Sequence, residues 1–257
     1  MLSRRYLRAL VVRAPQLQDV KFAAQAAYRK ITKTPFEPEF EVLRALSLAQ
    51  GECIVDVGAN RGQSIDAIRL YLKTAPIHAF EANAALAAAL TRRLSGQANL
   101  QIHPCGLADN ERSETLFIPY YGEYMFDGLA SIDRDEAAGW LNAKALVGFD
   151  ERRLRIEETA VSLRTFDAFN LSPAFMKLDV QGAERAVLAG AEQTLRRSKP
   201  VLLIETGRDE ALVAAVQAAG YEAFNYVSGR LSPRRNAVRN TVFAHPSAPR
   251  GLERLMK

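Results

Sequence analysis

Two carboxylates stand where apolar, strand-like segments end in the second half of the chain. Asp179 follows the run "FMKL", and Glu205 ends the run "PVLLIE". The carboxyl ends of neighbouring parallel strands meet at one edge of an open α/β sheet, and ligands bind at that edge. We therefore expect Asp179 and Glu205 to lie at one site and to be the catalytic residues.

Three roles for this pair stay open at the level of sequence. Asp179 can be a general base, or can orient an acceptor hydroxyl for in-line transfer of a group. Asp179 and Glu205 can instead bind a divalent cation, because oxygen ligands suit Mg²⁺. In the third reading both acids cap the helices that follow them. Glu184 is only a secondary candidate. It lies in the first turn of a predicted helix, where stabilisation by the helix dipole is enough to explain an acid.

A glycine-rich turn follows the first predicted strand, in the stretch "VDVGANRGQ". Gly58 and Gly62 flank this turn, where glycine lets the backbone bend tightly and approach a ligand. The N–H groups at the start of the next helix, near Asn60, favour polar or anionic ligand groups. Asp56, which precedes Gly58, can hold an ammonium group directly or through water.

An acid after the second predicted strand completes a nucleoside-binding pattern. Glu81 follows "IHAF" at the gap of about 20 residues from the glycine turn that suits a hydrogen bond to a ribose diol. The third predicted strand ends near Cys105, in a position that can border an adenine. The predicted cofactor residues are Asp56, Gly58, Asn60, Gly62, Glu81, Ala82, Cys105, Gly106 and Leu107.

Two cofactors use this geometry. A dinucleotide requires Gly-x-Gly-x-x-Gly, so that its pyrophosphate can sit on the helix start, and one of these glycines is missing here. S-adenosylmethionine has no pyrophosphate and needs an open glycine turn and an acid for its ribose. The spacing Asp-x-Gly-x-x-x-Gly therefore favours the methyl donor over NAD and over a bare strand–helix turn.

The alternation of apolar segments predicts the elements that position these residues. From residue 52 onward, strand-like and helix-like segments alternate, which implies a parallel sheet with helices on both faces. We expect an α/β fold with about seven strands in one mostly parallel sheet, its last two strands pairing as an antiparallel edge. The run "AERAVLAGAEQTLRRS" is predicted to form one helix.

Two segments fall outside this alternation. Residues 1–50 are predicted to be a helical segment broken by Pro35 and Pro38, with a helix over 42–51 that ends at Gly51. Residues 113–158 are predicted to be an insertion on the acceptor side, helical over 134–158, within a domain that spans 51–257. Its aromatic residues either form an acceptor wall or pack the insertion: Tyr120, Tyr121, Tyr124, Phe126 and Trp140.

With these motifs in this order, the chain resembles the FkbM-type family of S-adenosylmethionine-dependent methyltransferases. The resemblance rests on "VDVGANRGQ", "AFEAN", "FMKLDVQGAERAVLAGAEQTL" and "VLLIE". It implies a class I, Rossmann-like methyltransferase fold with seven strands, and methyl transfer to hydroxyl groups of sugars or polyketide-type molecules. The family usually has Glu where this chain has Gln181. The segment "LDVQGA" also lacks the Asn/Asp-Pro-Pro-aromatic run of amino-group methyltransferases, which favours an oxygen acceptor.

The expected function is O-methylation of a small-molecule or glycan acceptor, with S-adenosylmethionine as donor and Mg²⁺ if the metal reading holds. The resemblance implies that the target is the hydroxyl of a carbohydrate or glycoconjugate. Two alternatives stay open. A nicotinamide-dependent oxidoreductase would use the same sheet edge, and a binding module without catalysis would keep the same core.

Composition narrows the partners and the compartment. The chain has 257 residues, of which 48% are hydrophobic and 25% charged, with a formal net charge of +5. Much of the positive charge is terminal arginine, so we expect solvated side chains and no nucleic-acid site. Cys53 and Cys105 lie in apolar runs without metal-binding spacing, which is typical of reduced cytoplasmic thiols. No apolar run reaches the ~18 residues of a membrane span.

Overall fold

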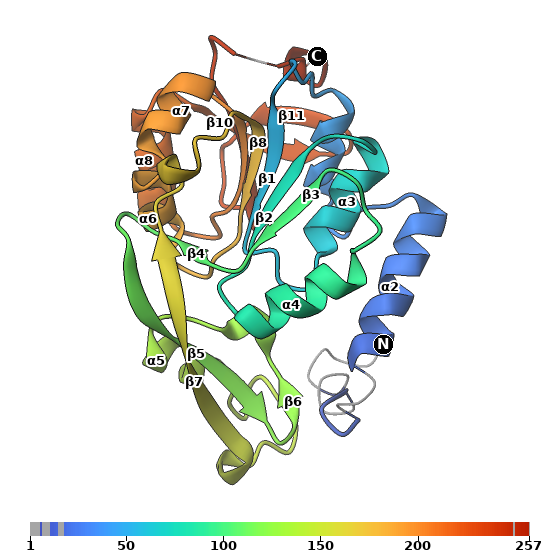
Figure 1. Cartoon of the computed structure of the whole chain (residues 1–257), viewed down its shortest axis with the longest axis vertical. Coiled ribbons are helices and arrows are strands. Elements are labelled where there is room, and N and C mark those ends of the chain that lie inside the picture. The colour runs from blue at the N-terminus through green and yellow to red at the C-terminus, as the bar shows by residue number, and fades with distance from the viewer. Residues whose placement is uncertain (1–5, 7–10, 15–17, 249, 257) are drawn as a thin grey trace.

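The structure is a computed structural model that describes residues 6, 11–14, 18–248 and 250–256 (Figure 1). The main sheet is formed by β1 (Cys53–Val57), β2 (Ile77–Phe80), β3 (Leu100–His103), β8 (Pro173–Leu178), β9 (Val201–Glu205), β10 (Glu222–Val227), β11 (Arg230–Pro233) and β12 (Asn240–Ala244). In the described chain its order is β11-β10-β12-β9-β8-β1-β2-β3. The strands from β9 to β3 are parallel, whereas β12, β10 and β11 pair antiparallel. The predicted α/β architecture and antiparallel edge are confirmed.

The predicted count of seven strands is wrong, because the described part of the main sheet has eight. The additional strand, β11, pairs with β10 through a two-residue turn at Ser228 and Gly229. Both turn residues have positive φ, at 50° and 86°, as the hairpin turn whose twist matches the strands requires. The Ser-Gly pair was the available sequence signal for this hairpin.

Helices cover both faces of the main sheet (Figure 1). One face packs against α3 (Gln63–Tyr71), α4 (Ala84–Arg93) and the 3₁₀ helix η2 (Pro38–Arg44), and the other against α6 (Glu184–Ala189), α7 (Glu192–Ser198) and α8 (Glu210–Ala218). The single helix predicted over 183–198 is two, α6 and α7. The break lies at Gly190, where a Cβ would stand 1.9 Å from the carbonyl oxygen of Ala108.

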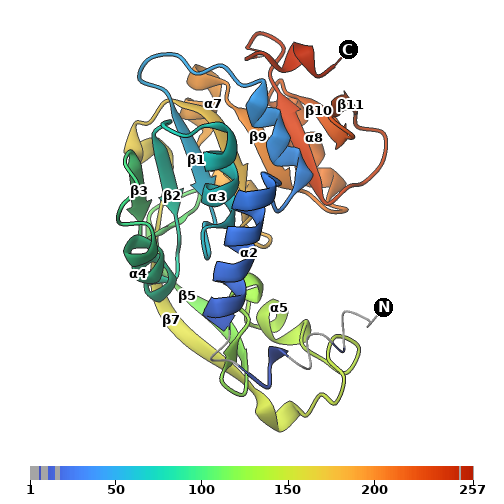
Figure 2. The ribbon, with the colours of Figure 1, turned by 90° about the vertical axis from the view of Figure 1, so that its right-hand side faces the viewer.

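The N-terminal segment is helical only in part. Helix α2 (Gln18–Thr32) runs beside α3 (Figure 2), and most of residues 1–17 lie outside the described residues. The helix predicted over 42–51 is wrong: η2 ends at Arg44. Beyond it the backbone turns to the C-terminal residues, since Ser47 N donates to Arg250 O at 3.0 Å.

The segment predicted as an insertion forms most of a second sheet. Its strands are β4 (Gly106–Leu107), β5 (Arg112–Tyr121), β6 (Tyr124–Met125) and β7 (Leu154–Arg164), in the order β4-β7-β5-β6. The long antiparallel pair of β5 and β7 extends away from the main sheet (Figure 1). The helix predicted over 134–158 is largely wrong, because α5 (Arg134–Gly139) is short and β7 begins at Leu154. The β-branched residues Ile156, Thr159 and Val161 in "RIEETAVSL" are typical of a strand.

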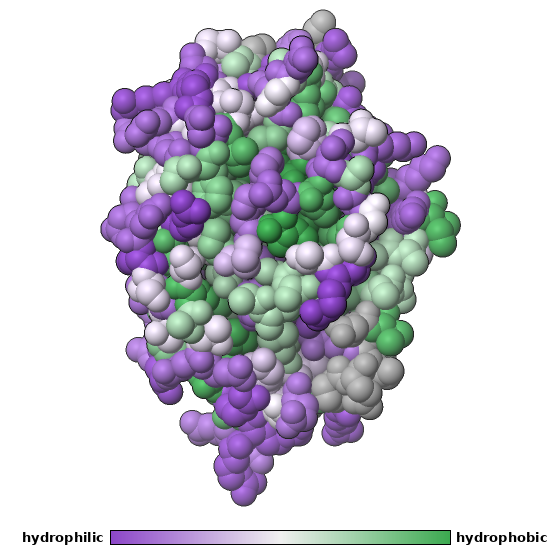
Figure 3. All heavy atoms as spheres, viewed as in Figure 1, coloured by the Kyte–Doolittle hydropathy of each residue, from purple (hydrophilic) through white to green (hydrophobic). Residues whose placement is uncertain are grey.

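The remaining described elements are the 3₁₀ helices η3 (Asp127–Leu129), η4 (Glu151–Arg153), η5 (Asp167–Phe169) and η6 (Leu252–Arg254). In the space-filling view, hydrophobic residues gather across the middle of the face, and hydrophilic residues dominate its lower end (Figure 3). None of the described helices combines the length and the apolar character that a membrane span requires.

Candidate active site

A cavity of about 350 Å³ opens where β1, β2 and β8 end. This is the edge at which the strand order reverses, with β1 between β2 and β8, and ligands of open α/β sheets bind at such a point. Eight residues predicted from separate motifs line this one cavity: Gly58, Asn60, Glu81, Ala82, Cys105, Gly106, Leu107 and Asp179.

The glycine turn lies against the turn that follows β8. Gly58 has φ of +83°, and a Cβ there would stand 2.0 Å from the carbonyl oxygen of Asp179. Asp179 N also donates to Val57 O at 3.1 Å. Glycine is therefore needed both for the backbone conformation and for the close approach of the two turns.

Asn60 stands at the far side of the same turn. Its backbone has φ of 49°, which asparagine tolerates better than most residues. Its side-chain oxygen is buried and has no hydrogen-bond partner among the described residues. Buried polar atoms are usually paired, so this oxygen is available to a ligand in the cavity.

Two of the predicted cofactor residues do not line the cavity. A Cβ on Gly62 would meet Arg93 and Leu90 at 2.3 and 2.6 Å, so this glycine lets α4 pack closely. Asp56 is fully buried within β1. Asp56 is therefore not placed to contact a ligand in the cavity directly.

Glu81 is held by backbone groups on both sides of the cavity rim. Its two carboxylate oxygens accept hydrogen bonds from Asn60 N at 2.7 Å and from Asn83 N at 2.9 Å. Burial raises the pKa of Glu81, and these two N–H groups work against that rise. The fixed carboxylate keeps further lone pairs for a ligand hydroxyl.

The third predicted strand divides at the cavity. Residues 104 and 105 separate β3 from β4, and the chain crosses from the main sheet to the second sheet there. A Cβ on Gly106 would stand 2.6 Å from Leu163 and 3.3 Å from Ala82. Leu163 and Ala82 therefore leave no room for a side chain at position 106, and Gly106 forms part of one wall of the cavity.

Asp179 is bonded on both carboxylate oxygens. Lys177 Nζ donates to Oδ2 and Gln181 Nε2 donates to Oδ1, each at 2.9 Å. Burial alone would raise the pKa of Asp179, but Lys177, together with hydrogen bonds from Glu205 and Gln181, outweighs it and holds the pKa below its usual value. Asp179 is thus the ionised carboxylate of the site.

Glu205 does not line the cavity, but it lies close enough to Asp179 for the two acids to influence each other. Arg239 donates to its two oxygens at 3.1 and 3.3 Å. Burial raises the pKa of Glu205, Arg239 opposes the rise, and the charge of Asp179 adds to it. When this pair shares a proton, Glu205 is the member that carries it.

The capping reading of these two acids is wrong. The turn before α6 is held by Glu184, which accepts from Val180 N and Gly182 N, both at 3.1 Å. Helix α8 is capped by Asp209, which accepts from Leu212 N at 2.8 Å. Neither Asp179 nor Glu205 has a capping task.

The metal reading finds no support. In the part of the chain that the structure describes, no group of three or more His, Cys, Asp and Glu residues is arranged to hold a metal ion. Lys177 and Gln181 already occupy the two oxygens of Asp179, and a cation there would meet the ammonium group.

The predicted aromatic wall does not line the cavity. The insertion contributes Leu116, Asp127, Gly128 and Ala130 to it. Tyr121 and Tyr124 instead pack with Val12 and Leu146, and Trp140 is 42% exposed. The packing interpretation of the aromatic residues is therefore the one observed.

Three charged residues at the site were missed in the sequence. Lys177 lies in the middle of the apolar run "FMKL" and is 1% exposed, and a lysine in such a run was the available signal. Glu37 and Arg239, which form an ion pair at 3.3 Å, come from segments far apart in the chain, and no spacing rule connects them.

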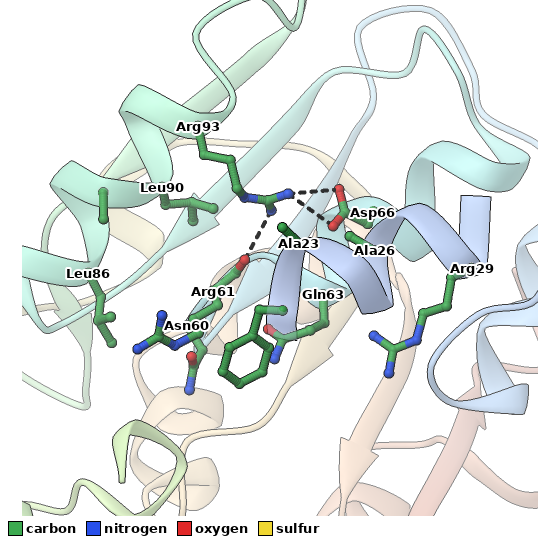
Figure 4. A pocket seen from close by; sticks show the side chains of 12 residues that line it. Ala23, Ala26, Arg29, Asn60, Arg61, Gln63, Asp66, Leu86, Leu90 and Arg93 are labelled. Atoms are coloured by element: carbon green, nitrogen blue, oxygen red, sulfur yellow. Dashed lines mark hydrogen bonds and ion pairs between the residues drawn. The ribbon is translucent and has the colours of Figure 1, made fainter. Parts of the chain in front are cut away.

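A second cavity, of about 300 Å³, lies behind the glycine turn between α2, α3 and α4 (Figure 4). Six of its twelve lining residues are apolar, among them Leu86 and Leu90, and the other six are polar or charged. Arg93 spans its upper side and donates to Asp66 and to the carbonyl oxygens of Arg61 and Gly62. Arg93 is thus engaged within the fold.

Solved structures with a similar chain path include three methyltransferases. An FkbM methyltransferase from Methylobacillus flagellatus KT is 18% identical, with a TM-score of 0.48, over 78% of this chain and 45% of its own. A putative methyltransferase from Streptococcus mutans in complex with SAH is 11% identical (TM-score 0.42; 81% and 96% covered). An rRNA methylase from Streptococcus thermophilus is 14% identical (TM-score 0.41; 82% and 95% covered).

This chain spans less than half the length of the Methylobacillus protein, and we draw no functional argument from similarities at these scores. No curated protein sequence matches the chain. The profile of the Methyltransferase FkbM domain matches residues 56–223, which is more than half of the chain. The matched range contains the glycine turn, Glu81, Asp179 and Glu205. The chain therefore belongs to the FkbM methyltransferase family.

Proposed function

We propose that the protein transfers a methyl group from S-adenosylmethionine to a hydroxyl group, and that the acceptor is a carbohydrate or glycoconjugate. The observation that carries the proposal is the single cavity in which the glycine turn, Glu81, the residues 105–107 and Asp179 meet. Membership of the FkbM family supports methyl transfer. The hydroxyl acceptors that the sequence resemblance implies, among them sugars, support the class of acceptor.

The residues of the cavity fit the methyl donor. The unpartnered oxygen of Asn60 and the open backbone at Gly58 suit the polar methionine part. Glu81 offers acceptor lone pairs to the two ribose hydroxyls. The wall formed by Cys105, Gly106 and Leu107 suits the flat adenine. The donor supplies an activated methyl on a sulfonium, and the protein supplies positioning and a proton acceptor.

Asp179 is the group proposed to handle the acceptor. Methyl transfer forms a bond from the acceptor oxygen to carbon and breaks the bond from carbon to sulfur, whose electron pair stays on sulfur. The hydroxyl proton leaves as this bond forms, and the ionised carboxylate of Asp179 lines the cavity where it can accept that proton. Glu205, whose pKa is raised by burial and by the charge of Asp179, is the protonated neighbour of this carboxylate.

The test combines binding with turnover. Calorimetric titration with S-adenosylhomocysteine should give saturable binding, whereas NAD should give none. Transfer of labelled methyl from the donor to glycans extracted from cells should be unaffected by a metal chelator. Saturable binding of NAD without binding of S-adenosylhomocysteine would refute the choice of cofactor.

Asp179→Asn should keep the affinity for S-adenosylhomocysteine and lower turnover by about 10²–10⁴-fold, the usual contribution of a general base. Asp209→Asn is the matched control, because it makes the same change at the same sheet edge outside the cavity, and asparagine caps a helix as well as aspartate does. Full turnover in Asp179→Asn would remove Asp179 from the chemistry.

A further inference from the structure

A lysine is buried directly beneath the cavity. Lys177 lies near the end of β8, is 1% exposed, and donates to Asp179 at 2.9 Å. In the register of the main sheet it pairs with Asp56 on β1. A lysine is rarely buried to this extent unless it is paired, so its neighbours must account for its charge.

Three carboxyl groups surround the ammonium of Lys177, and they come from three elements. Asp179 follows β8, Asp56 lies within β1, and Glu37 precedes η2. Burial alone would lower the pKa of Lys177, but these three acids outweigh it and raise the pKa above its usual value. The ammonium therefore stays charged.

The three carboxyl groups are not equivalent. Asp179 has hydrogen bonds on both oxygens. Asp56 is fully buried and Glu37 is 4% exposed, and Glu37 also faces Arg239 at 3.3 Å. Burial favours the protonated form of a carboxyl group. Burial raises the pKa of Asp56 to about 7, and it also raises the pKa of Glu37.

The charges then balance in one way. Lys177 carries one positive charge, and Asp179, which has the direct bond, carries the matching negative charge, while burial favours the protonated form of the other two acids. Glu205 and Arg239, the remaining charged groups that face Asp179, form a bidentate pair with each other. Lys177 and Gln181 donate hydrogen bonds to different oxygens of Asp179. These two bonds fix the orientation of the carboxylate.

We propose that Lys177 is the positioning residue of the methyl-transfer site, which keeps the carboxylate of Asp179 ionised and directed at the cavity. This inference rests on the proposed role of Asp179 as the proton acceptor. Lys177 does not touch the reacting atoms and acts through Asp179. A lysine that merely filled the core would leave the ionisation of Asp179 unchanged when it was replaced.

The experiment reads that ionisation directly. Protein labelled with ¹³C at the aspartate carboxyl carbons is titrated by NMR, and the resonance of Asp179 is identified by its loss in Asp179→Asn. In Lys177→Met the titration of Asp179 should move to higher pH by about one unit or more. Lys177→Arg, which keeps the charge, should leave it close to that of the unchanged protein.

A second readout needs no variant at position 177. In the unchanged protein Asp179 must titrate at lower pH than Asp56, and the reverse order would overturn the proposal even if Lys177→Met does not fold. An unchanged titration of Asp179 in a folded Lys177→Met would overturn it too.

Neither measurement requires an acceptor, so failure of the proposed function is distinguishable from failure of this inference. Where labelled methyl transfer is detected, the acid limb of the pH–rate profile should move upward in Lys177→Met. Affinity for S-adenosylhomocysteine should stay within about threefold of the unchanged protein, since Lys177 does not line the cavity. A profile that keeps its acid limb would contradict the inference.

Discussion

The close approach at Gly58 can be tested with an internal control. Gly58 and Gly51 both have φ of +83°, so alanine at either position carries the same backbone strain, about 1–2 kcal/mol. They differ in space: a Cβ on Gly51 meets nothing within 4 Å, whereas a Cβ on Gly58 would stand 2.0 Å from the carbonyl oxygen of Asp179. The difference between the two variants therefore isolates the contact of the turns.

The expected costs follow from this geometry. Gly51→Ala should lower the free energy of unfolding by about 1–2 kcal/mol. Gly58→Ala should lower it by about 1–3 kcal/mol more, because the backbone of Asp179 must move to make room. That movement displaces a wall of the cavity, so Gly58→Ala should also weaken binding of S-adenosylhomocysteine by at least about tenfold, or 1.4 kcal/mol.

Denaturant titration measures the first effect, and calorimetric titration of the folded variants measures the second. Gly51→Ala should bind S-adenosylhomocysteine like the unchanged protein. Equal destabilisation in the two variants, with equal affinity, would show that the turns after β1 and β8 do not meet as described, and the reasoning about the cavity would fail with them.

Two further predictions concern acids of the same edge. Glu81→Gln should weaken S-adenosylhomocysteine binding by about 10–100-fold, since a hydrogen bond to a charged group contributes about 1.5–3 kcal/mol; calorimetry checks this, and unchanged affinity would argue against a ribose contact. Asp56 has a folded-state pKa of about 7 against a usual 3.8, so the folded state binds more protons and the free energy of unfolding should fall as pH rises between these values, by about 4 kcal/mol in all. Denaturant titrations from pH 4 to 8 should show a steeper fall in the unchanged protein than in Asp56→Asn, in which the other buried acids still titrate, and parallel curves would contradict it.

The features that could be predicted from the sequence are those that follow from patterns of neighbouring residues. The strand–helix alternation and the glycine turn are local patterns, and residues predicted from four separate motifs meet in one cavity. The division at Gly190 could not be predicted in this way, because the helix pattern continues through it. At the break, Gly190 lies so close to the carbonyl of Ala108 that a side chain would clash, a contact between residues that no local pattern connects.

The misassigned insertion has a similar cause. Its charged residues suggested a helix, but β7 is a strand in which exposed and covered residues alternate with one interruption, at Glu157 and Glu158. For the aromatic residues, type alone left two roles open, an acceptor wall or packing of the insertion. Type cannot tell which face of a strand they occupy, and register does.

The site also depends on residues outside the part of the chain that the family profile matches. Glu37 and Arg239 lie on either side of residues 56–223, yet they form an ion pair, and Arg239 binds Glu205. Arg239 thus faces both Glu37 and Glu205, and Asp179 is the acid that bonds directly to Lys177. The matched range contains Lys177 and Asp179, while the flanking segments contribute Glu37 and Arg239, the second of which pairs with Glu205. It follows that replacing Arg239 would free Glu205 to compete with Asp179 for protons, so the ionisation of Asp179 is set by the whole sheet edge and not by the motif alone.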